Sequence, residues 1–108
     1  MEANKQDMGR VFEGTYSDPN HPEGFRVVSM LDEWEGEVRK ANCLLVDDKG
    51  GKEFNLPAKV GKREDGSEFI MIDFAPKGGP KDFEGIWETD GIRYLKDNNK
   101  WPMTEKKN

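Results

Sequence analysis

Several side chains that are suited to chemistry lie in one loop of this 108-residue chain. The only histidine, His21, stands between two prolines in residues 17–24, together with Asp18 and Asn20. Because proline fixes the backbone angle φ, such a loop is rigid enough to hold polar side chains ready for a ligand. We therefore predict a binding site in this loop, although the same residue types are also typical of a plain turn between two strands.

Asp73 is a second candidate, because it shares a strand face with apolar side chains. In the predicted strand 68–74, alternation puts Asp73 on the same face as a phenylalanine and a methionine. If that face lines a cavity, desolvation raises the pKa of Asp73 unless a cation such as Arg26 or Arg93 pairs with it. A structural ion pair or a position at a strand edge is the alternative interpretation.

Catalysis has few possible participants in this chain. His21 is the only imidazole that could serve as a base for a nucleophile. Cys43 lies in an apolar run, where a buried and unreactive thiol is the usual outcome. The enzyme hypothesis that remains is an acid/base catalyst that uses Asp73 or Asp18 with His21.

Two tryptophans stand among polar residues and suggest a surface for sugars. Trp34 lies in the acidic segment 32–37, and Trp101 follows two asparagines and a lysine at 98–100. Sugar rings stack on exposed aromatic faces, while neighbouring carboxylates and amides bind their hydroxyl groups. We therefore include Trp34 and Trp101, with Arg26, among the predicted ligand-binding residues.

The charge balance argues against two classes of partner. The chain carries 17 basic and 22 acidic side chains, a formal net charge of −5. An excess of carboxylates opposes approach to the phosphates of nucleic acids and anionic membranes. We expect neither nucleic acid nor membrane as a partner, whereas a small molecule, a glycan or a protein remains open.

The sequence predicts no cofactor and no metal centre. One cysteine and one histidine cannot form an intramolecular disulfide or the usual zinc site, which leaves only carboxylate ligands open. No run approaches 18 apolar residues, and residues 1–7 lack the apolar core of a signal peptide. We expect a soluble cytoplasmic protein, or a plastid protein if a transit peptide has been removed.

Glycine and proline divide the chain into short segments and favour an all-β fold. With 12 glycines and six prolines, there is little room for long helices. We predict a single domain over 1–108, a small antiparallel barrel or sandwich of seven to nine strands, with flexible tails at 1–9 and 104–108. The expected strands are 10–16, 25–31, 38–46, 52–56, 58–62, 68–74, 83–88, 92–95 and 100–103.

Local patterns refine this prediction but leave one segment open. Asp65-Gly66 and Asp90-Gly91 are strong hairpin signals. Residues 37–46 fit a strand, yet the apolar spacing that begins at Leu31 and ends at Leu45 also fits a helix. Residues 12–16 and 83–87 share a Phe-Glu-Gly-x-aromatic pattern, in which the glycine leaves space for a ring or for backbone from across the sheet.

The predicted core comes from the apolar positions of these strands. It consists of Phe12, Tyr16, Val28, Met30, Leu44, Val46, Phe54, Leu56, Val60, Ile70, Ile72, Phe74, Ile86, Trp87, Ile92 and Tyr94.

Two stretches carry a likeness to a known family. They are 12–26, Phe-Glu-Gly-Thr-Tyr-Ser-Asp-Pro-Asn-His-Pro-Glu-Gly-Phe-Arg, and 73–101, which begins Asp-Phe-Ala-Pro-Lys-Gly-Gly-Pro-Lys-Asp-Phe-Glu-Gly-Ile-Trp. They resemble a family of small β-rich proteins from algae, plants and cyanobacteria that has no assigned biochemistry. The resemblance implies one compact β domain and a photosynthetic source, and it supplies no catalytic residues. The family has Cys-Pro where this chain has Gly24 and Phe25, so no role of that cysteine carries over.

These observations favour a non-enzymatic binding domain whose ligand is a small molecule or glycan at a barrel mouth or loop cleft. The acid/base enzyme is one alternative, and a protein-interaction module that uses a sheet edge is another. An enclosed apolar cavity would favour a small molecule, an exposed Trp34 a glycan, and an unpaired strand edge a protein partner.

Overall fold

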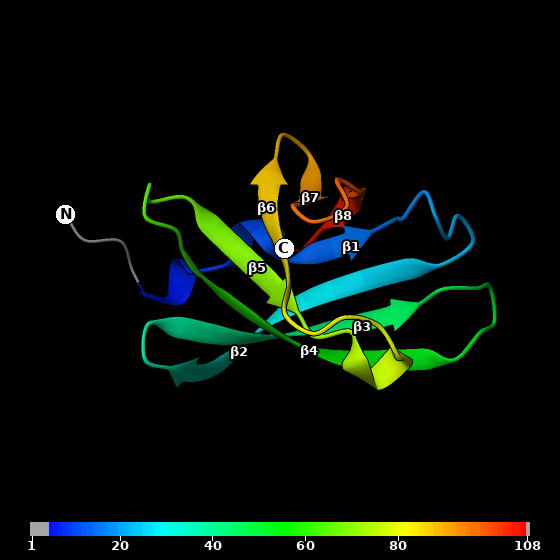
Figure 1. Cartoon of the computed structure of the whole chain (residues 1–108), viewed down its shortest axis with the longest axis horizontal. Coiled ribbons are helices and arrows are strands. Elements are labelled where there is room, and N and C mark those ends of the chain that lie inside the picture. The colour runs from blue at the N-terminus through cyan, green and yellow to red at the C-terminus, as the bar shows by residue number, and fades with distance from the viewer. Residues whose placement is uncertain (1–4, 108) are drawn as a thin grey trace.

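The computed structural model describes residues 5–107, which form a closed antiparallel barrel (Figure 1). Each strand pairs with its neighbours in chain order, and β1 pairs with β8 to close the barrel. The strands are β1 (Gly14–Tyr16), β2 (Phe25–Glu35), β3 (Val38–Val46), β4 (Glu53–Lys62), β5 (Glu68–Ile72), β6 (Phe83–Glu88), β7 (Gly91–Tyr94) and β8 (Lys100–Lys106). The all-β prediction is confirmed, and the eight strands form a barrel rather than a sandwich.

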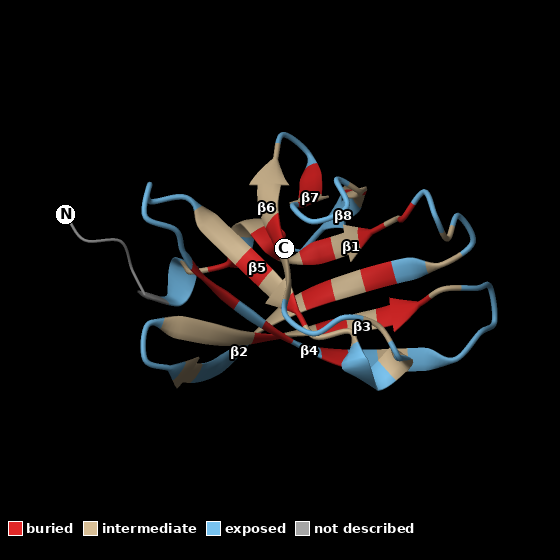
Figure 2. Ribbon diagram, in the orientation of Figure 1, coloured by how far each residue is buried: buried red, intermediate tan, exposed pale blue. Residues whose placement is uncertain are grey.

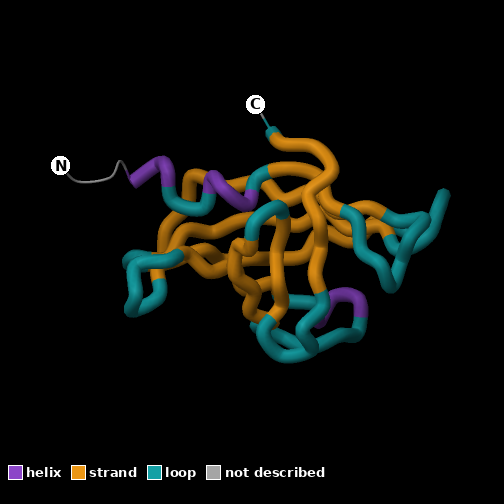
Figure 3. Tube along the Cα trace, turned by 90° about the horizontal axis from the view of Figure 1, so that it is seen from above, coloured by secondary structure: helices purple, strands orange, loops and turns teal. Residues whose placement is uncertain are grey.

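Helix is confined to three 3-10 segments among the described residues (Figure 3). They are η1 (Lys5–Asp7), η2 (Arg10–Phe12) and η3 (Ala75–Lys77). Strand β1 is therefore shorter than the predicted 10–16, because its first residues form η2.

The turn chemistry of the sequence correctly locates two hairpins. Between β4 and β5, Gly66 adopts a φ of 87°, and the carboxylate of Asp65 accepts a hydrogen bond from the Ser67 amide. Between β6 and β7, Thr89 takes a φ of 59° immediately before Asp90. Positive φ at such positions lets the chain reverse within a few residues.

The open segment 37–46 forms strand β3 from Val38 onward, and the helix interpretation is wrong. Val28 pairs with Cys43, and Met30 pairs with Ala41, in a long antiparallel hairpin. The chain reverses at Gly36, whose φ is 64°. The helix-like spacing arises because apolar residues of two different strands happen to lie three and four positions apart.

Other boundaries also differ from the sequence prediction. The expected strands 52–56 and 58–62 are one strand, β4, that runs through Pro57. A proline is tolerated in a strand where its missing N–H is not required, and the Pro57 carbonyl still accepts the Asp73 amide at 2.9 Å. Strand β8 extends to Lys106, so most of the predicted C-terminal tail is strand. Of the predicted N-terminal tail, residues 1–4 lie outside the described residues, as does residue 108.

Buried side chains alternate along the strands and fill the barrel (Figure 2). Most predicted core residues are buried, but strand β3 directs Cys43 and Leu45 inward and leaves Leu44 half-buried. A shift of one residue moves every side chain of a strand to the opposite face of the sheet. Because residues 43–46 of β3 are all apolar, the sequence does not show which of them face inward. On β6, Ile86 is likewise only half-buried, whereas Gly85 is buried.

Gly85 makes room for an aromatic ring, as the sequence pattern predicts. It lies opposite Tyr94 in the register of β6 and β7. A Cβ at Gly85 would lie 2.6 Å from Ile92 Cγ2 and 3.2 Å from the Tyr94 ring. The absence of a side chain at this position therefore sets where Tyr94 lies in the barrel.

Candidate functional site

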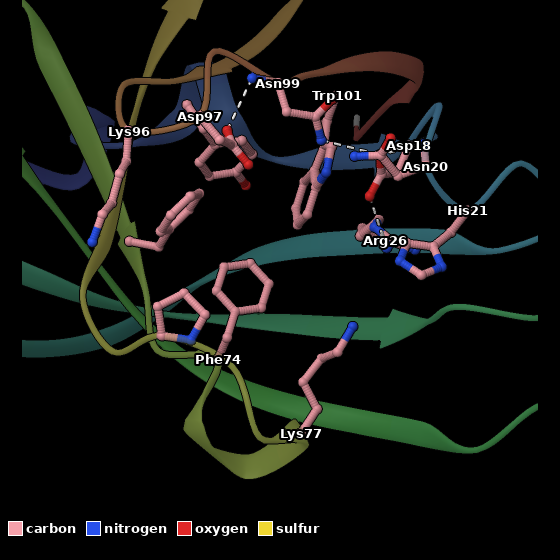
Figure 4. Close-up of a pocket in the computed structure, with 13 residues that line it drawn as sticks. Asp18, Asn20, His21, Arg26, Phe74, Lys77, Lys96, Asp97, Asn99 and Trp101 are labelled. Carbon is pink, nitrogen blue, oxygen red and sulfur yellow. Dashed lines mark hydrogen bonds and ion pairs between the residues drawn. The ribbon is translucent and has the colours of Figure 1, made fainter.

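One end of the barrel opens into a cavity of about 370 Å³ (Figure 4). The loops that follow β1, β5 and β7 surround it, together with the inward-facing residues at the nearby strand ends. Its lining consists of Asp18, Asn20, His21, Arg26, Phe74, Lys77, Pro80, Phe83, Tyr94, Lys96, Asp97, Asn99 and Trp101. Five of the seven predicted site residues meet here: Asp18, Asn20, His21, Arg26 and Trp101.

Arg26 is the buried centre of the polar side of this cavity. It is the second residue of β2 and only 1% exposed, because its side chain points into the barrel on the same face as Val28. Its Nη2 donates to Asp18 Oδ2 at 3.2 Å and to Asp47 Oδ1 at 2.6 Å, and its Nη1 donates to the Val46 carbonyl at 3.0 Å. Paired carboxylates and a carbonyl offset the cost of removing this charge from water.

Asp18 connects two of the loops that surround this cavity, which we call the mouth cavity. Besides the bond from Arg26, Asp18 accepts two hydrogen bonds at Oδ1. The backbone N–H of Asn20 donates one at 2.9 Å, and the side-chain Nδ2 of Asn99 donates the other at 3.1 Å. Asn99 belongs to the loop between β7 and β8, so these bonds tie that loop to the one after β1. Both oxygens of Asp18 are therefore occupied in holding the mouth together.

Asp47 is a member of the polar cluster that the sequence analysis missed. It follows β3 directly, and its carboxylate bonds to Arg26 and to Lys77 Nζ and lies 3.7 Å from His21 Nε2. Figure 4 shows Lys77 extending toward Arg26 and His21. Burial raises the pKa of Asp47, but the hydrogen bonds from Lys77 and Arg26 outweigh this effect and hold the pKa below its usual value.

Four aromatic rings form the apolar wall and contact one another in a closed cycle. The ring centroids are 5.8 Å apart for Phe74 and Phe83, 5.3 Å for Phe83 and Tyr94, 4.9 Å for Tyr94 and Trp101, and 6.1 Å for Trp101 and Phe74. Most of these pairs are edge-to-face, an arrangement that aromatic quadrupoles favour. Trp101 is 2% exposed, so it forms the inner wall and is not an open platform for a sugar.

Two buried polar atoms of the cavity residues have no hydrogen-bond partner among the described residues. They are the Tyr94 hydroxyl oxygen and Arg26 Nε. Burial raises the pKa of Tyr94 well above its usual value, so the hydroxyl remains protonated. Unpaired buried groups are uncommon in folded proteins and are costly when nothing satisfies them.

The two remaining predicted site residues lie elsewhere. Trp34 lines a different depression with Met8 and Phe69. Asp73 lines an outer depression on the barrel wall and accepts a hydrogen bond from the Ala75 amide at 2.9 Å. Asp73 therefore stabilises the start of η3 and lies apart from His21.

The cationic partners expected for Asp73 are engaged with other carboxylates. Arg26 binds Asp18 and Asp47, while Arg93 forms an ion pair with Glu88 at 2.8 Å. Cys43 is free and fully buried, as predicted, and burial raises the pKa of its thiol to about 12.

Comparisons with protein-family models, curated proteins and solved structures found no match for this chain. Within residues 5–107, no helix is long and apolar enough to span a membrane. In the same part of the chain, no group of three or more histidine, cysteine, aspartate or glutamate side chains is arranged to hold a metal ion.

Proposed function

We propose that this protein is a non-enzymatic binding domain that holds a small organic molecule in the mouth cavity. The observation that carries the proposal is the combination of a cycle of four aromatic rings with a buried polar cluster around Arg26, in one cavity. Small-molecule sites typically combine apolar walls with a few fixed polar groups, and their volumes begin at about 300 Å³.

The rigidity of the polar side supports binding rather than chemistry. Asp18 is held by three hydrogen bonds and Asp47 by two cations, so neither carboxylate is available as a free acid/base group. A preorganised site of this kind loses little conformational entropy when a ligand enters. The acid/base pairing of Asp73 with His21 has no such support, because Asp73 lies on the outside of the barrel.

Closure of the barrel leaves no strand of residues 5–107 with a fully unpaired edge, which favours a small molecule over a peptide that adds a strand. Each of the eight strands pairs with two neighbours over part of its length, including β1 with β8, while β2 beyond Val28 and β4 before Pro57 pair with β3 alone. Recognition by strand addition needs an exposed sheet edge with free backbone groups.

A neutral fluorescent probe, N-phenyl-1-naphthylamine, tests the proposal. Its emission should increase on binding, and Phe74→Ala should weaken the binding about tenfold or more by removing part of the wall. Phe69→Ala is the matched control, because Phe69 is also half-buried but lines a different depression. No saturable binding by the wild-type protein, or equal loss in both variants, would contradict the proposal.

Nuclear magnetic resonance locates the probe independently. The chain has three tryptophans, and each contributes one indole N–H resonance. We expect the Trp101 resonance to shift on titration while that of Trp34 stays in place, because only Trp101 lines the mouth cavity.

A further inference from the structure

The loop between β5 and β6 forms one side of the mouth cavity and is held to the barrel at few points. We propose that residues 74–82, which we call the lid segment, move as a unit to admit and release the ligand. The ion pair between Lys77 and Asp47 is the latch that keeps this segment closed. Its role in ligand exchange rests on the proposed function, since both concern the same cavity.

The lid segment covers part of the inner wall of the cavity. It contributes Phe74, Lys77 and Pro80 to the lining. The Phe74 ring packs edge-to-face on Trp101, with the ring centroids 6.1 Å apart (Figure 4). Because Trp101 lines the same cavity but is only 2% exposed, neighbouring side chains cover most of its ring. Phe74 is one of them, so movement of the lid segment uncovers part of the inner wall.

Hydrogen bonds within the loop make the lid segment a small unit of its own. The Phe74 amide donates to the Pro80 carbonyl at 2.9 Å. The Phe74 carbonyl in turn accepts the amides of Lys77 at 3.0 Å and Gly79 at 2.9 Å. None of these bonds involves the rest of the barrel, so the segment can change position without losing them.

A single polar contact ties the lid segment to the rest of residues 5–107 beyond the loop. It is the hydrogen-bonded ion pair between Lys77 Nζ and Asp47 Oδ2. The segment includes η3, which lies beside β4, but none of residues 74–82 is buried. Segments with few buried contacts open at a low cost in free energy. The ion pair is therefore the contact that decides how often the lid segment opens.

Asp47 is a fixed point for such a latch. Its Oδ1 accepts a hydrogen bond from Arg26 Nη2 at 2.6 Å, and Arg26 is 1% exposed and also bound to Asp18. The barrel thus holds the Asp47 carboxylate whether or not Lys77 is bound. The exposed fractions of the Lys77 and Asp47 side chains are 22% and 19%. Partial exclusion of water strengthens the attraction between the two charges.

The two ends of the lid segment have the features of hinges. Directly before its start, the Asp73 amide donates to the Pro57 carbonyl of β4 at 2.9 Å, which fixes where the barrel ends. At its other end, Asp82 takes a φ of 53° directly before β6. The side chains of Lys81 and Asp82 are exposed and form no hydrogen bond or ion pair within residues 5–107. Hinges are a few residues at the ends of elements that absorb a change in backbone angles.

Stopped-flow fluorescence with N-phenyl-1-naphthylamine tests the latch. Lys77→Met removes the ion pair and keeps an unbranched side chain, so the rate constants for association and dissociation should both increase about fivefold or more. Because the latch closes the cavity with or without the probe, the two rates should rise together, and the Kd should change far less than either. The probe is neutral, so the lost positive charge does not itself alter its approach.

Two further variants of the same segment serve as controls. Lys77→Arg keeps a cation beside Asp47 and should retain the slow rates of the wild type. Lys81→Met removes a lysine that forms no ion pair within residues 5–107, and both rates should stay at the wild-type values. Added salt screens the latch, so it should accelerate exchange in the wild type more than in Lys77→Met.

Nuclear magnetic resonance relaxation dispersion detects the movement without a probe. In the ligand-free wild type, exchange on the microsecond to millisecond timescale should be concentrated in residues 74–82. The open population should be larger in Lys77→Met and unchanged in Lys81→Met.

The outcomes separate the latch from the proposed function. Unchanged rates in Lys77→Met, or equal acceleration in Lys81→Met, would overturn the latch and leave the binding cavity standing. Faster dissociation without faster association would also overturn it, because Lys77 would then act by contacting the probe. Absence of probe binding would overturn the proposed function. Relaxation dispersion then tests the lid segment alone, and no exchange in residues 74–82 of either protein would overturn it.

Discussion

Arg26 Cζ lies 5.0 Å from the centroid of the Trp101 ring, and both side chains are almost completely buried. A cation over an aromatic face gains more energy when water is excluded than at an exposed surface. This contact joins the polar cluster of the mouth to its aromatic wall, so the two halves of the cavity are positioned by each other.

The first prediction concerns the buried ion cluster. Arg26→Met keeps much of the side-chain volume but leaves Asp18 and Asp47 without their shared cation, so it should lower the free energy of unfolding by about 3–5 kcal/mol. Urea denaturation measures the change. Arg93→Met removes a surface ion pair with Glu88 and serves as the control, with a much smaller expected loss. Equal losses in the two variants would show that Arg26 does not organise the mouth.

The second prediction compares two buried tyrosine hydroxyls. Tyr16 donates to the Phe12 carbonyl at 2.5 Å, so Tyr16→Phe should lower the free energy of unfolding by about 1 kcal/mol. Tyr94→Phe removes a hydroxyl that has no hydrogen-bond partner within residues 5–107 and should leave the stability unchanged or raise it. Thermal and urea unfolding of the ligand-free variants measure both. A large loss in Tyr94→Phe would mean that its hydroxyl makes a stabilising bond in the free protein.

The third prediction concerns the pH dependence that Asp47 confers. Its pKa in the folded protein is below the unfolded value of about 3.9, so the carboxylate stabilises the protein above that value and loses its effect as the pH falls below about 4. At pH 7, Asp47→Asn should lower the free energy of unfolding by about 1–3 kcal/mol. The difference from the wild type should shrink in urea titrations performed below pH 4.

The neighbouring residue supplies the control for this pH series. Asp48 is exposed, and Asp48→Asn should change the stability by no more than about 0.5 kcal/mol at pH 7. A difference between Asp47→Asn and the wild type that stays constant from pH 7 to pH 3 would contradict the role of the Asp47 charge.

The fourth prediction is that the Cys43 thiol is inert in the native state. The side chain is fully buried, and burial raises its pKa to about 12, so almost no thiolate is present at pH 8. Reaction with 5,5′-dithiobis(2-nitrobenzoate) should therefore be slow in buffer and fast in urea. Rapid labelling of the native protein would show that the barrel opens near β3.

The fifth prediction tests the space that Gly85 leaves for Tyr94. An alanine Cβ would lie 2.6 Å from Ile92 Cγ2 and 3.2 Å from the Tyr94 ring, so Gly85→Ala should lower the free energy of unfolding by about 1–3 kcal/mol. Gly61→Ala is the control, because its Cβ would meet mainly the outer edge of the half-buried Phe69 ring, which can move. A smaller loss at Gly85 than at Gly61 would contradict this packing argument.

The sequence alone determined much of the local structure, because local structure depends mainly on neighbouring residues. Glycine and proline spacing indicated an all-β chain, and Asp65-Gly66 located a hairpin that the structure contains. The predicted bounds of β6 match the structure, and so do those of β3, although the sequence left a helix open for that segment. The composition of the loop 17–24 was enough to select residues that lie at one cavity.

The tertiary structure decided which distant residues meet. Asp47 and Lys77 come from different loops, and nothing in either segment indicates that both face Arg26. Trp34 and Trp101 have similar polar neighbours in the sequence, yet Trp101 is buried in the cavity wall and Trp34 is not.

Closure of the barrel is the physical reason for these differences. Pairing of β1 with β8 joins the two ends of the described chain, and its register depends on the twist and length of all the strands between them. The same pairing pattern decides which face of β3 is turned toward the core, and it directs Cys43 rather than Leu44 inward. Such long-range pairings are favoured by the burial of a whole core, so local sequence patterns cannot reveal them.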